Sequence, residues 1–103
     1  MSTYNIELKE NGTLLKISWG EQATNDLIVQ DADARLHELQ KTGELTGGPL
    51  IRVNGPASLP VAMVISHHLL HLYETVAVFD PKLGKYVVVS AHGGPHTLGN
   101  LID

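Results

Sequence analysis

The sequence predicts an α/β fold, a small single domain with a mixed sheet of about five strands and two main helices. Two observations support this prediction. Apolar runs of strand length recur along the chain with turn residues between them. Two longer segments instead carry apolar residues at steps of three or four, as helices do. The 103 residues, 43% of them hydrophobic, suffice for one modest core, so we expect one domain over residues 1–103.

The N-terminal part of the chain predicts a hairpin followed by a helix. Residues 4–9 and 14–19 read as strands, and Asn11-Gly12 between them is a strong hairpin signal because both residues tolerate positive φ. The segment from about Ala23 to Gln40 then predicts a helix, which Gly43 ends. Its apolar residues recur at helical steps: Ile28, Ala32, Leu36 and Leu39.

The middle of the chain predicts a βαβ unit. Leu50–Asn54 reads as an apolar strand and Gly55–Ser58 as a turn, after which Ser58 can cap a helix with Pro60 in its first turn. A second apolar strand follows at Val76–Phe79. We expect the two strands to be parallel, because they are joined by a helical crossover, which is right-handed in nearly all proteins.

The C-terminal part predicts one more strand and a loop-rich tail. A turn at Pro81–Gly84 leads into Tyr86–Val89, which we expect to pair antiparallel with the preceding strand. The tail is rich in glycine, and its apolar residues Leu101 and Ile102 are expected to fold back onto the domain.

Composition narrows the classes of partner. Seven Lys and Arg against eleven Asp and Glu give a net charge of −4, which argues against a long nucleic acid as the main ligand but permits a small nucleotide. There is no cysteine, so disulfides and cysteine-based zinc sites are excluded. The sequence shows neither a signal peptide nor an apolar run approaching the ~20 residues of a membrane span. We therefore expect a cytoplasmic protein without a membrane partner.

Three of the six histidines cluster near the end of the second predicted helix. His67 and His71 are spaced i and i+4, so they share a polar face, together with Glu74, and fit metal binding or proton transfer. His68 is expected to lean toward the sheet and to be structural. The alternative for the whole cluster is a set of surface or interface histidines without chemistry.

Further candidate residues lie in the turns. The Gly55–Ser58 turn precedes a helix N-terminus, where free N–H groups favour anions, although it lacks the Gly-Lys-Ser/Thr ending of a P-loop. Asp80 follows a buried strand, where α/β proteins place functional carboxylates, or it only initiates the Pro81 turn. Lys82 contacts a phosphate or solvates the turn. His92 and His96 flank a Gly-Gly-Pro segment that closes over a ligand or is simply a loop.

Three motifs resemble those of a known family. Asn54–Ala62, Phe79–Gly84 and Tyr86–Val89 resemble a small CRISPR-associated ring nuclease family that is distantly related to CARF domains and has some members fused to an AAA-type ATPase. The resemblance extends from Asn25 to Ile102. It implies a dimeric, CARF-like fold that binds cyclic tetra-adenylate, the second messenger of type III CRISPR defence. It also implies cleavage of that ring to linear products, aided by manganese.

The resemblance assigns roles to particular residues. It implies that His71 and Asp80 are the reactive pair, with Lys82 and His92 in support. The predicted catalytic residues are therefore His71, Asp80 and Lys82, and the predicted manganese ligands are His67, His71, Asp80 and His92. The turn and its neighbours form the predicted ligand-binding set: Arg52, Asn54, Gly55, Pro56, Ala57 and Ser58.

The predicted topology separates the reactive pair. His71 lies near the start of the strand that ends at Asp80, about 15–20 Å away at roughly 3.3 Å per residue. Both residues can then act on one phosphodiester only if they come from different subunits, so we expect homodimers that the ligand bridges into a tetramer or filament. Three alternatives remain from the sequence: a sensor that binds the ring without cleaving it, a manganese-dependent RNA exonuclease that trims adenylate tails, and an interaction module.

Overall fold

A computed structural model describes residues 2–103 and shows one six-stranded sheet with two helices. The predicted α/β fold is confirmed, with six strands in place of about five. In chain order the elements are β1 (Tyr4–Lys9), β2 (Leu14–Trp19), α1 (Asn25–Lys41), β3 (Gly48–Asn54), α2 (Leu59–Leu70), β4 (Tyr73–Asp80), β5 (Lys85–Ala91) and β6 (Leu101–Ile102). No helix within residues 2–103 is long and apolar enough to cross a membrane.

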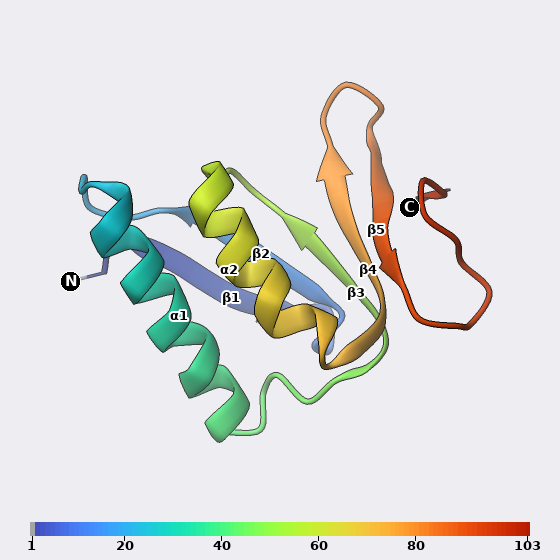
Figure 1. Cartoon of the computed structure of the whole chain (residues 1–103), viewed down its shortest axis with the longest axis horizontal. Coiled ribbons are helices and arrows are strands. Elements are labelled where there is room, and N and C mark those ends of the chain that lie inside the picture. Colours follow the sequence, from blue (N-terminus) through green and yellow to red (C-terminus); the bar gives the residue numbers. More distant parts are fainter. Residues whose placement is uncertain (1) are drawn as a thin grey trace.

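The six strands lie in the sheet in the same order as in the chain. The central strands β2, β3 and β4 are mutually parallel, whereas β1, β5 and β6 pair antiparallel with their neighbours. Right-handed crossovers that progress in one direction place successive helices on the same face of a sheet. Accordingly, α1 and α2 lie side by side over one face, and no third helix covers the other in the described chain (Figure 1).

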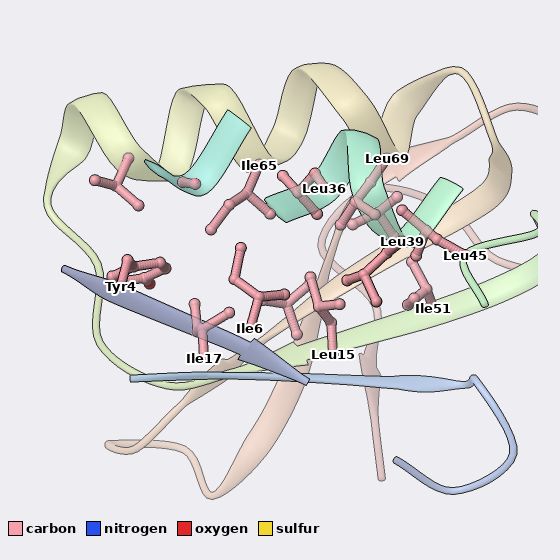
Figure 2. Packing of buried hydrophobic residues seen from close by; sticks show 14 of the residues in the cluster. Tyr4, Ile6, Leu15, Ile17, Leu36, Leu39, Leu45, Ile51, Ile65 and Leu69 are labelled. Atoms are coloured by element: carbon pink, nitrogen blue, oxygen red, sulfur yellow. The ribbon is translucent and has the colours of Figure 1, made fainter. Parts of the chain in front are cut away.

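The main core fills the space between the two helices and the sheet (Figure 2). Helix α1 buries the four residues that its apolar period selects: Ile28, Ala32, Leu36 and Leu39. Helix α2 contributes Val61, Ile65 and Leu69 in the same way. The periodicities of the sequence therefore identify the inward faces of both helices correctly.

A smaller apolar cluster lies on the helix-free face of the sheet. It consists of Leu14, Ala77, Tyr86 and Val88, against which Ile102 packs. Ile102 belongs to β6 and is paired with Tyr86, so the predicted folding back of Leu101 and Ile102 is confirmed as a short strand. The tail thereby covers part of a face that the helices leave open.

Two strands begin earlier than their apolar runs. β3 starts at Gly48 and β4 at Tyr73, and these two residues are register partners. Backbone pairing thus extends both strands beyond the apolar runs by which the sequence marks them. The predicted hairpin is also present, although its loop spans residues 10–13, with positive φ at Glu10 and Gly12 as well as Asn11.

The Asp31 carboxylate on α1 accepts hydrogen bonds from Thr3, and these bonds make the stability of the fold depend on pH. Asp31 accepts hydrogen bonds from the Thr3 backbone N–H at 2.9 Å and from the Thr3 hydroxyl at 2.7 Å. These bonds, the backbone one first, lower the pKa of Asp31 below its ordinary value.

We expect Asp31 to contribute to stability above the pKa of the unfolded chain, about 3.9, and to lose that contribution as pH falls through its lower folded pKa. The Asp31→Asn protein should therefore be less stable than wild type at pH 7, and the difference should shrink toward pH 3. Urea unfolding across this pH range measures it. A difference that is constant with pH would contradict the assignment.

Candidate functional site

The residues predicted for the site divide between the two ends of β4. Val53 is paired with Val78, so Gly55 and Asp80, each two residues further on, leave the sheet at the same, carboxyl end. His71 is the C-cap of α2 and precedes β4, so it lies at the amino end. His71 and Asp80 therefore lie at opposite ends of β4, as predicted, and seven residue steps along this strand correspond to about 23 Å, somewhat more than the predicted value of about 15–20 Å.

The Gly55–Ser58 turn is held in place from three sides. Gly55 has φ 140°, and a Cβ there would lie 1.9 Å from the carbonyl oxygen of Ile17 on β2. The buried Tyr4 hydroxyl donates to the Pro56 carbonyl at 2.5 Å, and burial raises the pKa of Tyr4 to about 12. Ser58 donates to Asn25 Oδ1 at 2.8 Å. The turn is thus tied to β1, β2 and the start of α1.

A groove of about 620 Å³ opens beside this turn and was not foreseen from the sequence. We call it the carboxyl-end groove; its lining is residues 19–25, Ile28 and Ser58. Asn25 begins α1 and Ser58 caps α2, so the N-termini of both helices face the same space. Trp19, with 45% of its surface exposed, forms one side. The sequence does contain one signal for this groove: the single tryptophan, Trp19, stands at the end of a predicted strand and before a predicted helix.

Arg52 and Asn54 do not join this groove. Their neighbours Ile51 and Val53 belong to the main core, so alternation along β3 points Arg52 and Asn54 to the helix-free face. There Arg52 pairs with Glu10 at 2.8 Å and lies 5.4 Å from the centre of the Tyr86 ring. Asn54 donates to the Tyr86 hydroxyl at 3.1 Å. Both side chains are thus engaged by other parts of the fold.

Asp80 has a structural role in the β4–β5 turn. Its Oδ1 accepts the backbone N–H of Lys82 at 2.8 Å and that of Leu83 at 3.3 Å. This is the turn-initiating role that an Asp before Pro favours. The turn extends beyond the helices (Figure 1), and Lys82 is exposed on it. Asp80 and Lys82 therefore remain accessible to a molecule that approaches the carboxyl end.

His71 and His92 come together at the other end of β4. A depression of about 550 Å³, the amino-end depression, is lined by Leu70, His71, Leu72, Tyr73, Glu74 and His92. The His92 backbone N–H donates to the Glu74 carbonyl at 2.7 Å, and His92 Nε2 lies 3.3 Å from Ser90 Oγ. Two imidazoles and a carboxylate beside one open space can transfer protons to and from a bound molecule.

The other two histidines of α2 are His67, which lies beside His71 as predicted, and His68, which does not face the predicted neighbour. The His67 and His71 rings lie 5.3 Å apart, edge to face, so the predicted shared face is confirmed. His68 is buried, but the expectation that it leans toward the sheet is wrong. Its Nε2 lies 2.6 Å from Asp33 Oδ1 and its Nδ1 lies 3.2 Å from Gln40 Oε1, so the ring is directed at α1. Residue periodicity cannot distinguish a helix-facing position from a sheet-facing one.

The predicted manganese ligands do not gather within one chain. His67 and His71 lie at one end of β4 and Asp80 at the other. Among residues 2–103, the one group of three potential ligand residues whose donor atoms lie within 4.8 Å of one another is Asp33, His37 and His68. A single copy of the chain is therefore not built to hold manganese on His67, His71, Asp80 and His92.

The fold and the site define a small α/β protein with a groove beside both helix N-termini at one end of its sheet and a histidine-lined depression at the other. Residues 27–103 match the family model described as CRISPR-associated protein (Cas_csx3). The chain therefore belongs to this CRISPR-associated family. A search of curated proteins and a search of solved structures each found no match.

Proposed function

We propose that the protein is a ring nuclease that binds cyclic tetra-adenylate and cleaves it to linear products, which would switch off type III CRISPR signalling. Its membership of a CRISPR-associated family supports this proposal. The observation that carries it is the separation along β4 of a groove beside both helix N-termini from a depression lined by His71 and His92. A CARF-like relationship is part of the proposal.

The carboxyl-end groove is the proposed binding site for the adenylate ring. The chain is acidic, so phosphates would be attracted mainly by the positive ends of the α1 and α2 dipoles, because Pro60 has no N–H and the Val61 N–H already donates to Ser58. Trp19 offers an exposed aromatic ring on which an adenine can stack. Asp80 and Lys82 lie at the same end of the sheet, where Lys82 can contact a phosphate.

The amino-end depression would supply the proton transfers. Cleavage requires in-line attack on phosphorus by the neighbouring ribose 2′-hydroxyl or by water, with a base for the attacking group and an acid for the leaving oxygen. We assign His71 to proton transfer, with His92 and Glu74 beside it, because these groups line one open space. Asp80 of a neighbouring copy would orient the attacking group.

Both ends can meet only between copies of the chain. The length of β4, about 23 Å from Tyr73 to Asp80, keeps the groove and the depression of one copy apart. We therefore propose that homodimers stack with the ligand between them, so that the carboxyl end of one copy faces the amino end of the next. Ligand would then drive dimers into tetramers or filaments.

Manganese would be held where two copies meet. His92 of one copy and Asp80 of the next would be its ligands in this arrangement, with His67 next to His71, which stays free for proton transfer. A divalent ion bound there would neutralise phosphate charge.

Incubation of the purified protein with cyclic tetra-adenylate tests the proposal. We expect multiple turnovers to linear fragments, resolved by chromatography, and faster conversion with manganese than with EDTA. Tight binding without conversion over hours at excess protein would replace the enzyme with a sensor. Linear polyadenylate cut as fast as the ring would favour an exonuclease, and failure to bind the ring would leave an interaction module.

Trp19 provides a direct report on the proposed binding site. It is the only tryptophan in the chain, so we expect cyclic tetra-adenylate to quench the intrinsic tryptophan fluorescence. Stacking of one base on an aromatic ring contributes about 1–3 kcal/mol, so Trp19→Ala should weaken binding by roughly 10-fold or more in calorimetry. Leu98→Ala, at an exposed apolar residue of the tail, is the matched control and should bind normally. Equal affinity of the Trp19→Ala protein would remove this groove as the site.

A further inference from the structure

A cluster of potential metal ligands lies between the two helices, away from both ends of β4. It consists of Asp33 and His37 on α1 and His68 on α2, and we name it the helix-pair cluster. We propose that it is a binding site for a divalent transition metal of the zinc type, which fastens α1 to α2. The proposal does not rest on the ring nuclease function.

The backbone places these residues opposite one another. Asp33, His37 and Gln40 are spaced i, i+4 and i+7, so they form one stripe along α1, beside its buried face. That stripe meets α2 at His68, whose ring centre lies 4.7 Å from that of His37. One donor atom from each of the three ligand residues lies within 4.8 Å of the other two.

The surroundings of His68 suit a bound cation. Only 7% of the residue is exposed, and both of its ring nitrogens face acceptor oxygens, Nδ1 that of Gln40 at 3.2 Å and Nε2 that of Asp33 at 2.6 Å. When Nδ1–H donates to Gln40, Nε2 carries a lone pair toward the Asp33 carboxylate. A metal ion shared by Nε2 and the carboxylate resolves that contact. A hydrogen bond on the non-ligating nitrogen is the usual support of a metal-bound histidine.

The set of donors indicates which metals fit. Two imidazoles and one carboxylate suit zinc, cobalt or nickel, and affinity for such a set is lowest for manganese. The side chains of Asp33 and His37 are 50% and 65% exposed, so they can adjust to close on the ion, and water can complete its coordination. The buried His68 provides the fixed ligand and the two exposed residues the adjustable ones.

Metal titration of untagged, EDTA-treated protein tests the proposal. Co²⁺ is the probe. We expect one equivalent of Co²⁺ to give the visible absorption bands typical of this ion at a low coordination number, and we expect Zn²⁺ to displace the bound Co²⁺. His37→Ala should weaken binding by at least about 10-fold, the lower figure seen when only a supporting residue is lost. His96→Ala, which removes a histidine outside the cluster and outside the proposed manganese ligands, should bind as wild type.

Thermal unfolding provides the second measurement, since a ligand that binds only the folded state raises its stability. Zn²⁺ should raise the unfolding midpoint of wild type and of His96→Ala, but not that of His37→Ala, whose exposed side chain can be removed without disturbing the fold. Unchanged Co²⁺ affinity in His37→Ala would overturn the proposal. So would loss of binding in His96→Ala, or no binding by wild type at millimolar Co²⁺.

Discussion

The His71→Ala and Asp80→Ala proteins are each expected to lose about 100-fold or more of their turnover of cyclic tetra-adenylate, the usual effect of removing a proton-transfer group. A mixture of the two inactive proteins should recover part of the activity. The physical reason is the length of β4, which holds His71 and Asp80 at opposite ends of each copy. A contact between an intact carboxyl end and an intact amino end then forms a complete site.

Random mixing of equal amounts should make roughly a quarter of the contacts complete, because each contact needs one particular variant on each side. His67→Ala is the matched control: it removes the neighbouring imidazole and should have a milder effect than His71→Ala. Specific activity should also rise with protein concentration in the dilute range. Absence of recovery, together with activity per subunit that is independent of concentration, would show that one copy suffices.

Gly55→Ala is expected to cost about 3 kcal/mol or more of unfolding free energy, which would leave a domain of this size barely folded. Two effects add at this position. The backbone has φ 140°, which disfavours any side chain, and a Cβ would lie 1.9 Å from the Ile17 carbonyl oxygen. The β3–α2 connection would have to move away from β2 to accept the methyl group.

Gly84→Ala is the control for backbone strain alone. Gly84 also has positive φ, 63°, but an added Cβ would meet no atom within 4 Å. We expect this variant to lose only about 1–2 kcal/mol. Urea unfolding of the two variants and wild type measures the difference. Similar losses of unfolding free energy in both variants would mean that the close approach to Ile17 does not contribute to the cost of Gly55→Ala.

Much of the fold follows from local patterns in the sequence. The apolar period of α1, the Ser58 cap with Pro60 behind it, and the Asn11 hairpin signal each act over a few residues, and each is present in the structure. The parallel pairing of β3 and β4 also follows, because a helical crossover joins them. The strand ends at Gly48 and Tyr73 and the short strand β6 did not follow, since backbone pairing rather than side-chain character sets them.

The candidate site depended more on tertiary structure. The sequence by itself determined that His71 and Asp80 lie at opposite ends of one strand, because a strand is straight and its length follows from residue count. Only the tertiary structure directed Arg52 to Glu10 and Tyr86, brought Trp19 beside the starts of both helices, and turned His68 toward Asp33. The physical reason is that side-chain partners come from elements distant in the chain, and no local pattern specifies which face of a neighbour they meet.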